Sequence, residues 1–161
     1  MMSELLNKET VKRVEKSLKE FDNSLKVIAL DKSARTAKDA AGSLQCELGS
    51  IVKSLVFKAE GEFLVCLVSG DKRCSLNKLK KILNKKDVAM ANANEVKDHT
   101  GFSIGGVSPI GYLKKLNTII DKSLSRFNYV YGAAGHPDCV FKITYSELVK
   151  LTSGKEAEII E

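Results

Sequence analysis

A glycine-rich segment, GFSIGGVSPIG at 101–111, is the part of this sequence best suited to let backbone approach a ligand closely. It contains four of the chain's eleven glycines and one of its two prolines. Gly105 and Gly106 can adopt positive φ without steric cost and have no Cβ to hold a ligand away, while Pro109 restricts the backbone at the exit. The segment is either an ordinary glycine-rich turn or a loop that presents backbone groups to a bound molecule.

A lysine inside a predicted strand is the second candidate. In the strand expected at 50–57, alternation places Lys53 on one face with Ile51, Leu55 and Phe57. An ammonium among these apolar side chains would lose hydration unless it had a partner. Either Lys53 extends to the sheet edge and reaches water, or it is a cation at the rim of a pocket for an anionic or strongly polar ligand.

The third candidate is YGAAGHPD at 131–138, which holds the second proline and one of the two histidines. Gly132 and Gly135 allow the backbone to bend there. His136 would then stand at the end of a strand, where catalytic groups are often found. A histidine in a turn can equally be structural.

The common catalytic motifs are missing from these segments. GFSIGGVSPIG has neither the GK[ST] ending of a P-loop nor the spacing of a dinucleotide fingerprint, and it contains no GxSxG elbow. Ser108 has no histidine close to it in the sequence. Backbone polarisation and a positioned water therefore fit the segment better than a covalent nucleophile does.

No metal or other cofactor is expected. The four cysteines have no CxxC spacing, and His99 and His136 lie far apart in the chain. Cys66 and Cys139 lie within apolar runs, which predicts that they are small core residues.

Length and composition predict one domain over residues 1–161, because 161 residues with 43% hydrophobic content can bury a core and no linker interrupts them. The N-terminus lacks the apolar stretch of a secretory signal, and nowhere do eighteen apolar residues run together. We therefore expect a cytoplasmic protein.

Basic residues are concentrated in one region of a chain whose net charge is +6. Seven lie between residues 72 and 86, while Leu76, Leu79, Ile82 and Leu83 recur there at helical spacing. The lysines are either the solvated side of an amphipathic helix or a surface that faces phosphates.

The predicted elements alternate between the two types of secondary structure without a strict βαβ repeat, which favours a mixed α/β fold. We expect a mixed parallel and antiparallel sheet, or a partly closed barrel, with helices packed outside. Two capping boxes, Asn92 with Glu95 and Thr144 with Glu147, mark the starts of the last two helices. Helices are predicted at 4–21, 36–47, along the basic segment, from 92 to near 101 and after 144, with a stop at Gly154. Strands are predicted at 25–30, 50–57, 62–69, 87–91, 117–121, 127–133 and 139–144, and no role is predicted for the tail 155–161.

The order of these segments resembles a known family. IVKSLVF, TGFSIGGVSPIG, VYGAAGHPD and the closing ITYSELVKLT are similar to segments of the YbaK/prolyl-tRNA synthetase-associated domain family, the aminoacyl-tRNA editing deacylases. The resemblance covers residues 25 to 153. The spacing from Gly105 to Pro109 resembles the GxxxP loop of that family, and Lys53 falls where the family carries its strand lysine.

The resemblance implies hydrolysis, without metal, of the ester that joins a wrong amino acid to the 3′-terminal ribose of a tRNA, most often tRNA for proline. It implies aminoacyl-tRNA as partner, together with association with prolyl-tRNA synthetase. Lys53 would hold the terminal nucleotide, with Ser54 as a polar contact beside it, and Gly105 and Gly106 would form the editing loop. The remaining implied site residues are Ser108, Pro109, Gly135 and His136 at the amino-acid pocket, and Lys72, Arg73, Lys78, Lys80 and Lys81 against the tRNA.

One departure bears on the substrate. Members that remove cysteine tend to have a Ser-Gly-Gly type segment followed by Arg-Gly where this chain reads AAGHP at 133–137. The AAGHP form resembles subgroups that act on alanine or other small residues. The alternative to an enzyme is a tRNA- or nucleotide-binding module that has the same fold without turnover.

Overall fold

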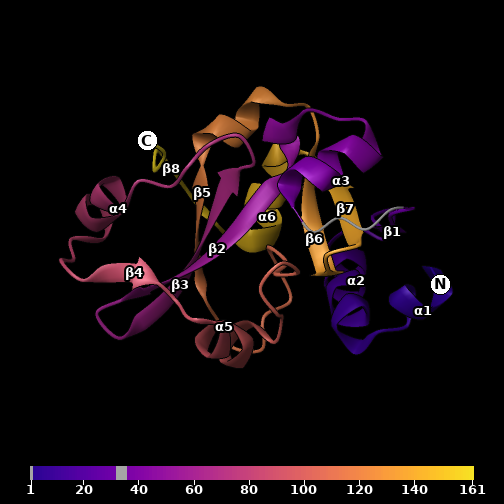
Figure 1. Ribbon diagram of the computed structural model, residues 1–161, viewed down its shortest axis with the longest axis horizontal. Coiled ribbons are helices and arrows are strands. Elements are labelled where there is room, and N and C mark those ends of the chain that lie inside the picture. Colours follow the sequence, from indigo (N-terminus) through magenta and orange to yellow (C-terminus); the bar gives the residue numbers. More distant parts are fainter. Residues whose placement is uncertain (1, 32–35) are drawn as a thin grey trace.

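Two β-sheets organise the computed structural model, which describes residues 2–31 and 36–161 (Figure 1). The larger sheet has the strand order β4-β2-β3-β5-β8, in which β4, β2 and β3 are antiparallel while β3, β5 and β8 are parallel. The smaller sheet is antiparallel with the order β1-β7-β6. The predicted mixed α/β class is confirmed, and the described residues form two sheets and no closed barrel. The strands are β1 (Val27–Ala29), β2 (Val52–Ala59), β3 (Glu62–Ser69), β4 (Val88–Met90), β5 (Asn117–Asp121), β6 (Val130–His136), β7 (Cys139–Ile143) and β8 (Lys155–Ala157).

Six α-helices lie around these sheets in the described residues. Figure 1 shows β2 crossing the middle of the molecule, with α4 and β4 at one end and β6, β7 and β1 at the other. The helices are α1 (Met2–Leu6), α2 (Glu9–Phe21), α3 (Ala37–Leu44), α4 (Leu76–Leu83), α5 (Ala93–Thr100) and α6 (Tyr145–Thr152), and two short 3₁₀ turns are η1 (Leu48–Ser50) and η2 (Lys122–Arg126).

The predicted hairpin is confirmed as the centre of the larger sheet. β2 and β3 pair from Val52 with Ser69 to Ala59 with Glu62. Glu60 and Gly61 between them have φ values of 49° and 87°. Positive φ at both central residues defines a two-residue turn whose twist matches that of the two strands it connects.

Each face of the hairpin packs against a different layer. Residues opposite one another in an antiparallel pair share a face, so β2 and β3 present one apolar set to α4 and another to the rest of the molecule. Toward α4 the sheet presents Phe57, Cys66 and Ile119, which cluster with Leu79. On the other face Val56, Val65 and Ile120 join Val14 of α2 and Phe141 of β7.

The helix caps follow the predicted chemistry. Both predicted capping boxes form: the Asn92 side chain accepts from the Glu95 N–H, and Thr144 does the same with Glu147. These helices therefore begin at positions that local sequence determines. Thr36 and Ser75 likewise accept from the N–H groups of Asp39 and Lys78 at the starts of α3 and α4.

Two predicted boundaries were wrong. The helix expected at 4–21 is two helices, because Lys8 has an extended backbone and begins α2 anew. Val11, Val14 and Leu18 are the fully buried residues of α2. The spacing of apolar residues did not reveal the break, because this spacing continues from one helix into the next. The strand expected at 127–133 begins instead at Val130 and extends to His136, because its pairing with β7 runs from Val130 with Ile143 to His136 with Cys139.

The C-terminal tail is part of the fold, a role that its sequence did not predict. β8 adds a parallel strand beside β5, and the side chain of Ile159 is fully buried against the α4 face. The Asp121 carboxylate accepts from the Ile159 N–H at 2.8 Å, and the Ile159 carbonyl accepts from the Ser75 N–H at 2.6 Å. The tail therefore joins β5 to the start of α4.

No helix within residues 2–31 and 36–161 has both the length and the apolar character that crossing a membrane requires.

We predict that Ile159→Ala lowers the free energy of unfolding by about 2–5 kcal/mol, because it leaves a cavity at a fully buried site. Denaturant unfolding followed by circular dichroism measures the change. Ile104→Ala is the matched control, since Ile104 is 64% exposed and should change stability by less than about 0.5 kcal/mol. Equal effects of the two substitutions would mean that the tail does not contribute to the core.

Candidate active site

A cavity of about 260 Å³ lies at the edge of β2 between the two sheets. Its volume lies just below the roughly 300–1,000 Å³ range of ligand pockets, which suits a small group better than a whole nucleotide. Apolar side chains dominate its walls, and six segments contribute them. The lining residues are Thr36, Ala37 and Ala40, residues 51–56 of the β2 segment, Met90, Ala91 and Val96, then Ile104, Gly105 and Val107, and finally Tyr131, Ala133, Pro137 and Val140.

The edge of β2 is open where it borders this cavity. β4 pairs only with residues 57–59 of β2, and the Ala91 N–H donates to the Val56 carbonyl at 3.0 Å. On the other side of the opening, Ile51 forms a single bridge with Tyr131. Because backbone groups two residues apart point the same way, the N–H and C=O of Ser54 point toward the cavity, as those of Val56 point toward β4. Within residues 2–31 and 36–161 no strand pairs with Ser54 at this edge, so its backbone groups are offered to a ligand.

The Ser54 side chain adds a second free polar group. Its Oγ is buried and has no hydrogen-bond partner within the described part of the chain. The neighbours two residues away, Val52 and Val56, are apolar and also line the cavity. A buried hydroxyl without a partner costs about 1–3 kcal/mol, so this site favours a ligand or a water that hydrogen-bonds to it.

Lys53 lies on the opposite face of the strand and reaches the rim. Its neighbours Leu55 and Phe57 belong to the apolar cluster beneath α4. The Lys53 Nζ donates a hydrogen bond to the backbone carbonyl of Lys72. Burial and the charge of Arg73 lower the Lys53 pKa, while Asp71 and Cys74 raise it. The lysine is half-buried, and the partner that holds its ammonium is an uncharged carbonyl.

The glycine-rich loop closes the cavity opposite β2. Gly105 lines the cavity with φ of 97°, a conformation that other residues rarely adopt. A Cβ on Gly106 would lie 3.1 Å from His136 Cα and 3.2 Å from Pro137 Cδ. The loop therefore packs directly on the AAGHP turn, and the two segments that sequence singled out meet at one site.

Arg13 anchors the loop at both ends, a contact that no motif indicated. Its Nε donates to the Gly111 carbonyl at 2.7 Å and its Nη2 donates to the Thr100 carbonyl at 3.0 Å. The guanidinium also lies over the ring of Phe102, with 4.5 Å between Cζ and the ring centroid. The loop is thus held against α2, and an arginine within a helix carries no sequence signal for such a role.

Three of the predicted pocket residues lie behind the cavity wall. Ser108 is fully buried, and its Oγ accepts from the Ile110 N–H at 3.2 Å. Pro109 packs on Gly132, where a Cβ would come within 2.8 Å of Pro109 Cγ. Gly135 abuts α2, since a Cβ there would lie 2.6 Å from the Thr10 carbonyl oxygen. These contacts support the loop and the turn from behind.

His136 is half-buried beside the cavity. Its Nδ1 accepts from the Asp138 N–H at 3.0 Å, so Nε2 carries the proton when the ring is neutral. Pro137, the next residue, lines the cavity. The structure brings His136 to the site through the turn, and its chemical role remains a prediction.

The predicted tRNA-contacting residues gather on and before α4. Lys78 and Lys81 are exposed on the helix, Lys80 is half-buried, and the Lys78 Nζ donates to the Ile160 carbonyl at 2.7 Å. Lys72 and Arg73 precede the helix in the turn that holds the Lys53 ammonium. The basic segment therefore adjoins the rim of the site through Lys53.

This architecture defines an α/β domain whose two sheets enclose a small apolar site at an open strand edge. The chain belongs to the aminoacyl-tRNA editing domain family, whose model matches residues 31–151. A solved structure described as "a putative trans-editing enzyme for prolyl tRNA synthetase" shares 37% identity and superposes with a TM-score of 0.91, covering 96% of this chain and 98% of that one.

Relatives of known sequence agree with this membership. The protein named "Putative Cys-tRNA(Pro)/Cys-tRNA(Cys) deacylase EbsC" of Enterococcus faecalis is 30% identical over 77% of this chain and 76% of its own length. YwhH of Bacillus subtilis, an uncharacterized protein, is 30% identical over 91% of this chain and 93% of its own. Proline–tRNA ligase of Thermosipho africanus is 35% identical over 62% of this chain, a stretch that makes up 18% of the ligase.

We predict that Gly105→Ala lowers the activity that this cavity supports by roughly tenfold or more while the protein stays folded. Alanine at positive φ costs about 1–2 kcal/mol, and its methyl group would stand at the cavity wall 3.8 Å from Pro137 Cγ. Steady-state kinetics and thermal unfolding measure the two effects.

Gly61→Ala is the matched control for this strain. Gly61 has a φ of 87° in the β2–β3 turn, and a Cβ there would contact nothing within 4 Å. It should lose similar stability and keep full activity. If Gly105→Ala also kept full activity, the loop would be only a turn.

Proposed function

We propose that this protein is a trans-editing hydrolase that removes a small non-cognate amino acid from mischarged tRNA for proline, acting in the cytoplasm on the 3′ ester. The observation that carries the proposal is the small cavity at the β2 edge, where Lys53 and Ser54 are among the polar residues that line otherwise apolar walls. Membership of the editing-domain family supports the same reaction class.

Hydrolysis of an aminoacyl ester requires the protein mainly to position the ester and a water molecule. An aminoacyl ester is already activated, so a fixed water and donors aimed at the developing oxyanion can supply the acceleration. The Ser54 N–H and Oγ, together with the loop around Gly105 and Gly106, are the groups available for that work. Water is the nucleophile in this scheme, and Ser108, buried behind the wall, is not.

Lys53 would hold the terminal nucleotide. Its ammonium is at the rim and is bound to a carbonyl, so its positive charge is not cancelled by an acidic partner in direct contact within the described residues. A phosphate or other anionic oxygen of the tRNA end would gain a charge-assisted hydrogen bond from it.

Cavity size and apolar walls would select the amino acid. An alanyl-sized group fits a site of this volume, and proline itself has to be spared because it is the cognate amino acid. Shape alone discriminates weakly, since one methylene is worth about 1–3 kcal/mol. The AAGHP turn, through Pro137, forms the wall that would set this limit.

The basic segment would contact the acceptor stem. Phosphate contacts from Lys72, Arg73, Lys78, Lys80 and Lys81 would orient the substrate without reading its sequence. The likeness to part of a proline–tRNA ligase supports a working association with prolyl-tRNA synthetase, which supplies the mischarged product.

Release of labelled amino acid from tRNA for proline tests the proposal. We expect the protein to hydrolyse at least one of the alanyl, cysteinyl and seryl esters and to leave prolyl-tRNA intact. Spontaneous hydrolysis without protein is the blank. Failure on all three mischarged substrates would remove this function and leave the binding-module alternative.

We predict that Lys53→Ala lowers turnover by roughly tenfold or more, the equivalent of one charge-assisted hydrogen bond. Lys58→Ala is the control, because Lys58 lies on the same strand but pairs with Glu95 at 3.1 Å, away from the cavity lining. Single-turnover deacylation at saturating protein measures both. A Lys53→Ala rate equal to wild type would exclude the proposed role.

Neutralising Lys80 and Lys81 should weaken tRNA affinity and flatten its salt dependence, by about one unit of slope for each phosphate that the protein no longer neutralises. Filter binding across a salt series gives the slope. Alanine at Lys12 and Lys16, both exposed on α2, is the charge-matched control. A slope identical to that of wild type would make the α4 lysines a solvated helix face.

A further inference from the structure

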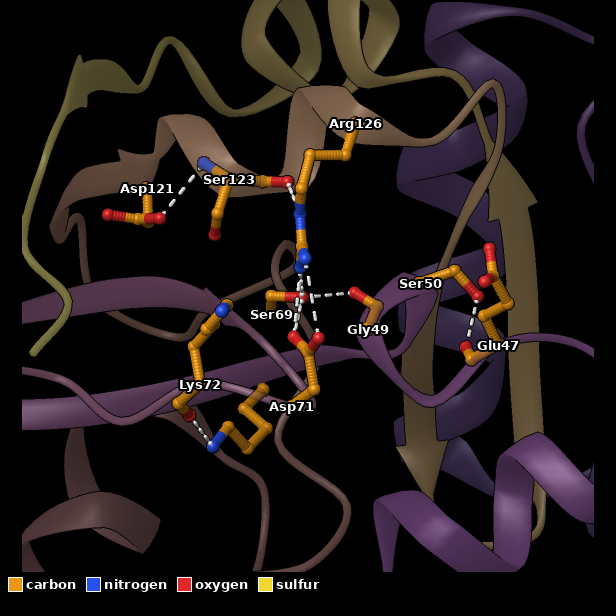
Figure 2. Close-up of polar contacts among 10 residues, drawn as sticks. Glu47, Gly49, Ser50, Ser69, Asp71, Lys72, Asp121, Ser123 and Arg126 are labelled. Atoms are coloured by element: carbon orange, nitrogen blue, oxygen red, sulfur yellow. Dashed lines mark hydrogen bonds and ion pairs between the residues drawn. The ribbon is translucent and has the colours of Figure 1, made fainter.

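A polar cluster beside the site joins three segments that are distant in the sequence (Figure 2). Arg126, on η2, points back to the turn that follows β3. Its Nη2 donates to Asp71 Oδ1 at 2.9 Å and to Ser69 Oγ at 2.8 Å, and its Nη1 donates to Asp71 Oδ2 at 3.3 Å. Its Nε donates to the Ser123 carbonyl at 2.7 Å. All three guanidinium nitrogens are therefore engaged, and the pairing with Asp71 is bidentate.

The same cluster fixes the turn at 69–72. The Lys72 N–H donates to the Ser69 carbonyl at 3.0 Å, which closes the turn. The Ser69 hydroxyl also contacts the Gly49 carbonyl of η1, as Figure 2 shows. Arg126 further lies over the ring of Phe127, 4.9 Å from its centroid. The position of the Lys72 carbonyl is thus determined by contacts from η1 and η2.

That carbonyl is the one that binds the Lys53 ammonium. The charged and titratable groups that act on Lys53 are Asp71, Arg73 and Cys74, all from this turn or the residues directly after it. Asp71 is the carboxylate among them. Hydrogen bonds from Arg126 hold the pKa of Asp71 at about 2, so Asp71 is charged at neutral pH.

Arg126 and Lys53 are bound by different acceptors in this cluster. Arg126 occupies the Asp71 carboxylate, so the carboxylate does not bind Lys53 directly and cancel its charge. The neutral Lys72 carbonyl orients the ammonium instead, and the nearby negative charge of Asp71 opposes the loss of its proton. A cation held in this way stays available to an anionic ligand.

We propose that Asp71 and Arg126 are positioning residues for Lys53: their ion pair fixes the 69–72 turn so that the Lys72 carbonyl aims the ammonium at the rim of the cavity. The inference rests on the proposed function, in which Lys53 contacts the 3′-terminal nucleotide. Neither Asp71 nor Arg126 lines the cavity, so they act through Lys53 and not on the substrate.

The Lys53 pKa gives the first test, because it needs no substrate. In protein carrying ¹³C-labelled lysine, the Lys53 Cε signal is assigned by its loss in Lys53→Arg and followed across pH by NMR. Asp71→Asn removes a negative charge that raises the Lys53 pKa, so the pKa should fall further below its ordinary value. An unchanged Lys53 pKa in Asp71→Asn would overturn the inference.

Kinetics give the second test. Asp71→Asn and Arg126→Gln should each lower the single-turnover deacylation rate by roughly fivefold, less than Lys53→Ala does, and should add almost nothing in a Lys53→Ala background, because coupled residues are not additive. A merely structural role would give the same loss in both backgrounds, and that result would overturn the inference. Glu62→Gln, which breaks the exposed Lys85–Glu62 pair, is the control. It should change neither the deacylation rate nor the Lys53 pKa.

Folding and function are kept apart in this design. The side chains of Arg126 and Asp71 are 40% and 34% exposed, so the variants should fold, and thermal unfolding verifies this. If wild-type protein deacylates no mischarged tRNA, the proposed function fails while the Lys53 titration still decides whether Asp71 controls the lysine.

Discussion

The incomplete pairing of β2 is the constraint on which the site depends. β3 pairs with the whole strand, but β4 pairs with only its last residues, and the opening before them is where the cavity lies. Alternation then separates two adjacent side chains: Ser54 faces the cavity layer and Lys53 faces the α4 layer. One strand thereby supplies exposed backbone groups, a buried hydroxyl and a cation at the rim. A β4 longer by a few residues would pair with the Ser54 backbone and close this edge to a ligand.

Close packing of two turns sets the size of that opening. The glycine-rich loop approaches the AAGHP turn so nearly that a Cβ on Gly106 would press on the backbone of His136. Behind them, Pro109 fills the space left by Gly132, and Arg13 ties the loop to α2. Protein interiors transmit such displacements because they are densely packed. These contacts keep the cavity small, as the proposed function requires of a site for a small amino acid.

The charged groups around the cavity rim leave the Lys53 ammonium without a directly bound carboxylate among the described residues. Asp71 satisfies Arg126, a carbonyl satisfies Lys53, and the lysines of α4 extend the positive surface away from the cavity. An acidic residue bound directly to Lys53 would have neutralised it, whereas a carbonyl orients it without that cost. In the proposed function, this basic surface would contact the acceptor stem of a charged tRNA while its aminoacyl end enters the cavity.

Local sequence determined the features that rest on short-range chemistry. The hairpin follows from its strand pattern and from glycine at the turn, and the capping boxes at Asn92 and Thr144 begin their helices where predicted. The motifs that carry the family resemblance could also be recognised in the sequence, because each is a continuous segment. Tertiary structure alone decided the rest. The cavity walls come from six separate segments, Arg126 meets Asp71 across 55 positions of chain, and the tail completes the sheet beside β5. Such contacts form when segments distant in the sequence pack together. The periodicity or spacing of residues within one short segment does not indicate which other segment will pack against it.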